Sequence, residues 1–201
     1  MNTIEMCRCT AFEGSRRIAS GELAEVALAA KAAIDRGGAE PILIFDDSTA
    51  KVIEVDFRGS ADDVRQRLRQ RAESEAAPSS TADAEPEGSK RPGRPKLGVI
   101  GREVTLLPRH WDWLNSQPGG ASVALRKLVD DARRTNEDMD RKRKARDTAY
   151  RFMAAMAGDH PGFEEALRAL FAGDAERFHS LIEAWPADIR DHTGKLAAAA
   201  F

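Results

Sequence analysis

The feature that most constrains the fold is a stretch near the middle of the chain that has no apolar periodicity. Residues 72–94 are mainly Ala, Glu, Ser, Pro and Gly. Such a composition buries too little apolar surface to offset the entropy lost on ordering, so it predicts a disordered linker. The chain of 201 residues is long enough for two small domains, one on each side of this linker.

The N-terminal part, residues 1–71, is typical of a small α+β domain. Alternating apolar residues over 6–12 predict a strand, and helical spacing over 23–34 predicts a helix that ends at two glycines. Residues 41–45 and 51–57 are rich in Ile, Val and Phe, so they predict a hairpin. The expected order of elements is β-α-β-β-α.

Short polar motifs in this part predict turns and caps. Asp46 and Asp47 lie between the two strands of the expected hairpin, where they are expected to form the turn rather than a pair of catalytic carboxylates. Ser60 is expected to cap the next helix, with Asp63 in the reciprocal position of a capping box.

Beyond the linker, which with its basic end spans 72–96, the sequence is mainly helical. An extended stretch at 102–107 precedes two helical patterns, at 109–116 and 122–134, and the second is expected to continue or restart through 140–146. Residues 136–201 are expected to form a helical C-terminal region. Its helices are predicted over 148–156, 163–171 and 175–185 and after Pro186.

Charge is distributed unevenly along the chain. Residues 1–89 carry 11 Lys/Arg and 17 Asp/Glu, residues 90–146 carry 15 and 7, and residues 147–201 carry 5 and 9. A cationic block favours a polyanionic partner, because each Lys or Arg placed at a phosphate releases condensed counterions. The alternative is a solvated helix face with balancing acids.

The basic end of the linker resembles an AT-hook, a short minor-groove motif built around Gly-Arg-Pro with basic flanks. Its candidate DNA contacts are Lys90, Arg91, Arg94 and Lys96. The resemblance implies that this arm lies in a narrow AT-rich minor groove, with Arg94 along its floor. The motif departs from the AT-hook pattern because Pro92 stands where the first core arginine is expected.

The segment 97–135 resembles a ribbon-helix-helix domain. The family pattern is a strand ending at a proline, a helix, a glycine-containing turn and a second helix that begins with small polar residues. This chain has Pro108, Gly119 and Ser122 at the matching places. The resemblance implies a homodimer through the strand at 102–107 and a phosphate held at the start of the second helix. Candidate contacts in this segment are Arg102, Ser122, Arg126 and Lys127.

Two features of that segment limit the resemblance. Whichever face of the strand points outward, it presents Val or Leu, whereas a strand that reads bases needs several polar side chains. Such a strand suits either thymine methyl groups or a protein partner. Trp111 is expected in the core and Trp113 partly exposed, because side chains two residues apart on a helix point in different directions.

Motifs for catalysis are missing from the sequence. The four histidines have no metal-ligand spacing, and no Walker loop or Gly-x-Gly-x-x-Gly is present. Cys7 and Cys9 lack further cysteine partners and are expected to be small core residues. No stretch is apolar enough to span a bilayer, so the protein is expected in the cytoplasm, without cofactor, metal or membrane partner.

From end to end, the chain resembles an uncharacterised proteobacterial domain-of-unknown-function family (DUF2239). The phrases that carry this resemblance begin at Thr10, Ile44, Glu103 and Ala184. It implies no activity. We expect a DNA-binding protein that is not an enzyme, either a regulator or a nucleoid-associated factor. A protein-interaction scaffold is the alternative. A third hypothesis is an enzyme that uses the N-terminal α+β unit. It would need a pocket lined by Asp46, Asp47 and a histidine.

Overall fold

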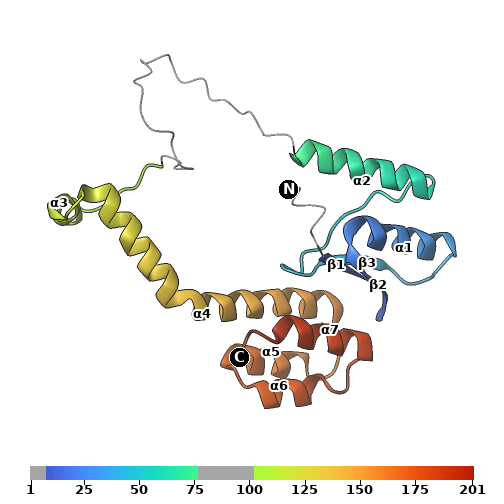
Figure 1. Ribbon diagram of the computed structural model, residues 1–201. Helices are drawn as coiled ribbons and strands as arrows, with labels where there is room; N and C mark the ends of the chain where they lie inside the picture. The colour runs from blue at the N-terminus through green and yellow to red at the C-terminus, as the bar shows by residue number, and fades with distance from the viewer. Residues whose placement is uncertain (1–7, 77–101) are drawn as a thin grey trace. The chain divides into compact units, whose positions relative to one another are not determined.

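A computed structural model describes residues 8–76 and 102–201 (Figure 1). The chain divides into two compact units. The main unit consists of residues 1–79 and 138–201, and the central unit of residues 80–137. Within the described residues there are three strands and seven α-helices, which confirms the expected α+β class.

The three strands form one antiparallel sheet in the main unit. Strand β1 (Arg8–Glu13) lies in the centre, between β2 (Arg16–Glu22) and β3 (Ile42–Asp46). The turn between β1 and β2 contains Gly14 at φ 53°, a conformation that glycine adopts without steric cost. The register between these strands shifts after Ala11, so that Ile18 is an extra residue in β2.

The order of elements differs from the expected one, since it is β-β-α-β-α. Strand β2 was missed because its sequence has one β-branched residue and no apolar alternation. The strand expected at 51–57 is wrong, because only Val52 forms an isolated bridge, to Phe45. Beyond that bridge, side chains take the place of a neighbouring strand: Arg71 donates to the carbonyl oxygen of Glu54 at 3.3 Å, and Arg67 to that of Asp56 at 2.8 Å.

Each face of the sheet covers a separate core, and the alternation of side chains along β1 explains the division. Cys9 and Ala11 point to one face, where they pack with apolar residues of helix α1 (Leu23–Asp35). Phe12 points to the opposite face and packs with Phe45 and with the C-terminal helices. The N-terminal sheet and the C-terminal helices, expected in separate regions, therefore share one core.

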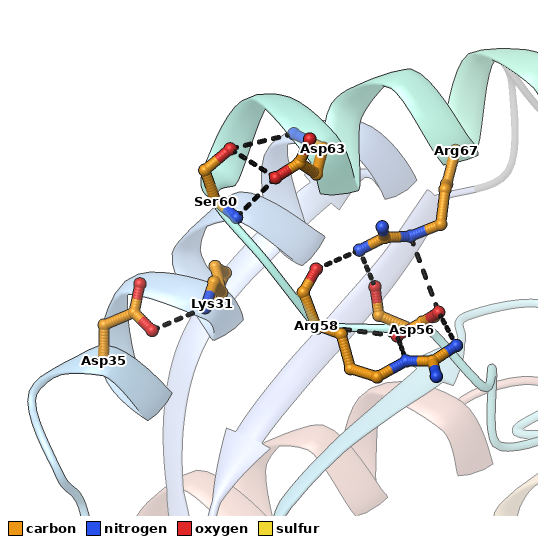
Figure 2. A network of polar contacts seen from close by, with 7 residues as sticks. All are labelled: Lys31, Asp35, Asp56, Arg58, Ser60, Asp63 and Arg67. Carbon is orange, nitrogen blue, oxygen red and sulfur yellow. Dashed lines mark hydrogen bonds and ion pairs between the residues drawn. The ribbon is translucent and has the colours of Figure 1, made fainter.

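Helix α2 (Ala61–Ala76) lies beside α1 in the main unit. Its N-terminus has the expected capping box: Ser60 N donates to Asp63 Oδ2 at 2.8 Å, and Asp63 N donates to Ser60 Oγ at 3.2 Å (Figure 2). These hydrogen bonds lower the pKa of Asp63, with the backbone bond from Ser60 the first cause. The helix extends to Ala76 and so includes residues 72–76, which were expected to belong to the linker.

The helices of the C-terminal half agree with the expected pattern, with one exception. The segments expected at 122–134, 140–146 and 148–156 form one continuous helix, α4 (Gly120–Met156). The remaining helices are α5 (Phe163–Ala172), α6 (Ala175–Ile182) and α7 (Ala187–Ala197). None of the helices in the described ranges is long and apolar enough to cross a membrane.

Candidate nucleic-acid interface

The central unit contains a helical hairpin. Helix α3 (Pro108–Ser116) begins with a proline, whose fixed φ suits the first helical position. The turn that follows ends at Gly119, with φ 87°, and α4 begins at Gly120, with φ 74°. Residues with a Cβ rarely adopt these φ values. Leu114 of α3 and Ala124 of α4 are the buried apolar residues in the described part of this unit. The helix, glycine turn and second helix thus follow the order that the sequence predicts.

The stretch 102–107 has no strand partner among residues 8–76 and 102–201. Arg102 is exposed, as are Val104 and Leu107. A ribbon of the expected kind pairs strands from two chains, so its formation stays a prediction.

Three candidate phosphate contacts lie on α4. Ser122 is in the first turn of the helix, and this first turn contains no acidic residue. Arg126 is one helical turn further along on the same face, and Lys127 follows it; all three are exposed. The free amides and the dipole of a helix N-terminus favour an anion at such a place. The structure thus brings Ser122 and Arg126 together, whereas Arg102 precedes the hairpin in an irregular segment.

The arm that resembles an AT-hook contains the other four candidate DNA contacts. Lys90, Arg91, Arg94 and Lys96 lie outside the described residues. Their contact with DNA stays a prediction from the sequence.

The positive charge is concentrated at one part of α4. Residues 102–137 carry six Lys/Arg and five Asp/Glu, whereas residues 138–146 carry five and two. Ion pairs three residues apart neutralise part of this charge. They join Asp131 to Arg134, Asp138 to Arg141 at 2.7 Å, and Asp140 to Arg143 at 2.7 Å. Exposed pairs of this kind contribute little to stability, so they leave the arginines available to a polyanion.

The central segment also exposes an unusual share of its apolar side chains. Of the twelve large hydrophobic residues that are exposed in the described ranges, eight lie between residues 104 and 139. Trp111 is 36 % exposed and Trp113 51 % exposed, so the core position expected for Trp111 is wrong in the single chain. The short hairpin buries too little surface to cover both rings. The other six are Val104, Leu107, Val123, Leu128, Val129 and Met139.

A second polar cluster lies in the main unit, around the turn that follows β3. Asp46 forms this turn as expected, since its Oδ1 accepts from the backbone amides of Ser48 at 2.7 Å and Thr49 at 2.8 Å. Asp47 instead accepts from Thr10 Oγ1 at 2.7 Å and from Lys195 Nζ at 2.8 Å. Burial favours the neutral form of Asp47, but these two bonds hold its pKa below the usual value.

His192 on α7 lies next to this cluster. It is 1 % exposed, and its ring centroid is 4.6 Å from that of Phe152 and 5.4 Å from that of Phe12. Neither ring nitrogen has a hydrogen-bond partner among the described atoms. Burial lowers the pKa of His192 to about 4, so the ring is neutral at pH 7. The cluster therefore joins the turn after β3 to α7, and neither nitrogen of His192 bonds to Asp47.

Sequence reasoning did not identify this cluster, because Thr10, Asp47 and Lys195 are far apart in the chain and belong to no motif. Their only signal was the turn chemistry of Asp46 and Asp47. The described part of the chain has no group of three or more His, Cys, Asp or Glu side chains that could hold a metal ion. Cys9 is buried, as expected, and Cys7 lies outside the described residues.

Comparison with known proteins places the chain in a family without giving it an activity. No curated protein and no solved structure matches the sequence or the fold. One family model matches residues 8–197, which include most of the main unit and the whole central unit. The chain therefore belongs to the family described as an uncharacterized protein conserved in bacteria (DUF2239).

Proposed function

We propose that this protein binds DNA and acts by binding rather than by catalysis, as a cytoplasmic regulator or nucleoid-associated factor. The observation that carries the proposal is the cationic block at residues 90–146, with 15 Lys/Arg against 7 Asp/Glu between two acidic flanks. Its described part lies on exposed segments, where phosphates can reach it. The interaction with a polyanion is electrostatic and therefore sensitive to salt.

In this proposal the cationic block contacts DNA at two places. The arm with Arg94 enters an AT-rich minor groove, where a narrow, electronegative floor attracts arginine. The start of α4, with Ser122, Arg126 and Lys127, holds a backbone phosphate. Because leucine and valine occupy the stretch 102–107, we expect groove shape and charge to govern the binding more than base sequence.

A gel shift with an AT-rich duplex tests the proposal. We expect the full chain to bind, and we expect the affinity to fall by roughly 10³-fold or more between about 50 mM and 200 mM salt if six or more phosphates are contacted. Arg94→Ala should weaken binding, whereas Arg69→Ala, which removes an exposed arginine of α2, should not. Absence of salt-sensitive binding, or binding that Arg94→Ala leaves unchanged, would contradict the proposal.

We also propose that the protein is a homodimer joined through the stretch 102–107 and the exposed apolar residues of the hairpin. A two-fold interface brings the same surface of two chains together, so apolar residues left uncovered in one chain cover those of the other. Light scattering after gel filtration should give twice the chain mass of 22.0 kDa. Leu128→Ser should reduce that mass towards one chain, whereas Ile34→Ser, on α1, should not.

The same exposed apolar residues favour a second candidate function, a scaffold that docks onto another protein. Trp111 and Trp113 are of the type that dominates protein interfaces. A stoichiometric protein partner that remains bound after nuclease treatment and is lost with Trp113→Ala, in a chain that shows no DNA binding, would favour the scaffold over the DNA-binding protein.

A further inference from the structure

The main unit presents two exposed aromatic rings in contact with each other. Tyr150 of α4 is 43 % exposed and Phe171 of α5 is 50 % exposed. Their ring centroids are 6.2 Å apart and their planes are inclined at 61°. Tyr150 is the only tyrosine in the chain, and most of the phenylalanines are buried or half-buried in the core. An exposed pair of this kind is typical of a contact surface.

Arg146 lies next to this aromatic pair, one turn before Tyr150 on α4. Its Nε donates to the carbonyl oxygen of Ala200 at 3.1 Å. One terminal nitrogen of Arg146 would be 3.1 Å from a Cβ at Gly173, the residue that ends α5 two positions after Phe171. The guanidinium therefore lies at the end of α5, held against the backbone in a fixed position.

A second pair of rings involves the residue that follows Ala200. Phe201 follows Ala200 and is half-buried, and its ring centroid is 6.2 Å from that of the exposed His179 on α6. Arg146 thus binds the backbone beside both ring pairs: its partner Ala200 precedes Phe201, and its neighbour Gly173 follows Phe171 by two positions.

The same part of α4 carries the positive charge. Residues 141–146 contain five Lys/Arg and no acid. Arg143 lies one helical turn before Arg146 and two turns before Tyr150. Its side chain is well exposed, although it pairs with Asp140. Within the described residues, no ion pair joins Lys142, Lys144 or Arg146 to a carboxylate.

We propose that this aromatic–basic face, made of Tyr150, Phe171, Phe201, His179, Arg143 and Arg146, binds single-stranded nucleic acid. Unpaired bases stack on exposed rings, and the intervening phosphates pair with guanidinium groups. A duplex keeps its bases stacked on one another, so it could use the cations of this face but not the rings. The proposal rests on the proposed nucleic-acid function and adds a second mode of binding, in the main unit.

Fluorescence anisotropy with the full chain tests it. The probes are a labelled oligothymidylate of about 15 nucleotides and an AT-rich duplex of equal length. The double variant Tyr150→Ser/Phe171→Ser should weaken oligothymidylate binding by at least about 5-fold per ring removed and leave duplex binding within about twofold. Both side chains are exposed, so the variant should fold; circular dichroism confirms this. Ile34→Ser/Val52→Ser, at exposed apolar positions elsewhere in the main unit, is the matched control.

Ultraviolet crosslinking of the wild-type chain to oligothymidylate adds an independent readout, because mass spectrometry should find the crosslinked peptides on α4 and α5. Equal binding of oligothymidylate by the wild type and the Tyr150→Ser/Phe171→Ser variant would overturn the inference. So would crosslinks confined to the central unit, or duplex binding without any oligothymidylate binding, and in these cases the DNA-binding proposal would stand. Failure of both probes to bind would overturn both proposals.

Discussion

The main unit and the central unit use their apolar residues in opposite ways. In the main unit the sheet is covered on both faces, and Phe12, Phe45 and Phe152 are almost fully buried. In the central unit Leu114 and Ala124 are buried, while both tryptophans are exposed. The main unit is thus stabilised by its own core, whereas the hairpin leaves most of its large apolar side chains exposed, as the proposed dimer or scaffold requires.

The largest expected effect separates the two units directly. Phe152 lies within 5.3 Å of the rings of Phe12, Phe45 and His192, measured between centroids. Phe152→Ala should therefore lower the free energy of unfolding by about 3–5 kcal/mol, because it leaves a cavity at the centre of the core. Leu128→Ala should change that energy by less than about 0.5 kcal/mol at concentrations where the chain is monomeric. Urea denaturation followed by circular dichroism measures both, and equal losses would remove the contrast between the units.

A smaller effect should appear with pH in the main unit. The pKa of His192 is about 4 in the folded chain and 6.5 in the unfolded chain. Between pH 6.5 and pH 4, this histidine is therefore protonated in the unfolded state and neutral in the folded state. Stability should then be complete above about pH 6.5 and fall by roughly 3 kcal/mol as the pH falls to 4. The lowered pKa of Asp47 acts in the same direction, at still lower pH.

The measurement is the urea midpoint at several values between pH 7 and pH 4. His192→Phe keeps an aromatic ring in the core without a titratable nitrogen, so it should flatten most of this dependence. His110→Phe, at an exposed position on α3, should leave the curve unchanged. A His192→Phe curve as steep as that of the wild type would show that other groups cause the acid sensitivity.

Two serines at helix starts give the smallest expected contrast in stability. Ser60 exchanges hydrogen bonds with Asp63 at the start of α2 (Figure 2), so Ser60→Ala should cost about 1 kcal/mol. The side chain of Ser122, in the first turn of α4, makes no hydrogen bond within the described residues, and Ser122→Ala should change stability by less than about 0.5 kcal/mol. A loss of stability with Ser122→Ala would mean that this serine has a structural role, which would weaken its assignment as a phosphate contact.

Local signals in the sequence predicted most helices and caps, because the interactions that form them are local. The Ser60 capping box, the Asp46 turn and the glycines before α4 all depend on residues a few positions apart. Strand β2 and the bridge at Val52 depend instead on pairing with other strands, and no local sequence pattern predicts which strands pair. The run at 51–57 alternates like a strand, yet Arg67 and Arg71 from α2 bind its carbonyl oxygens.

In the candidate site, too, the local features could be predicted from the sequence and the long-range contacts could not. The positions of Ser122, Arg126 and Lys127 on one exposed helix follow from periodicity. The charge surplus at 141–146 can be counted in the sequence. Its position beside Tyr150 and Phe171 required the packing of α4 against α5 and the C-terminal residues. No local pattern could predict that the N-terminal sheet packs on the C-terminal helices, because Phe12 and His192 are 180 positions apart.

The salt dependence of duplex binding tests the central claim most directly. For the full chain, the logarithm of the association constant plotted against the logarithm of the salt concentration should fall with a slope of roughly −4 to −8, as expected for several phosphate contacts. Neutralising one contacting cation, as in Arg126→Gln, should reduce the magnitude of the slope by about 1. A slope near zero, or one that neither Arg126→Gln nor Arg94→Ala changes, would contradict the claim that the central basic segment binds DNA.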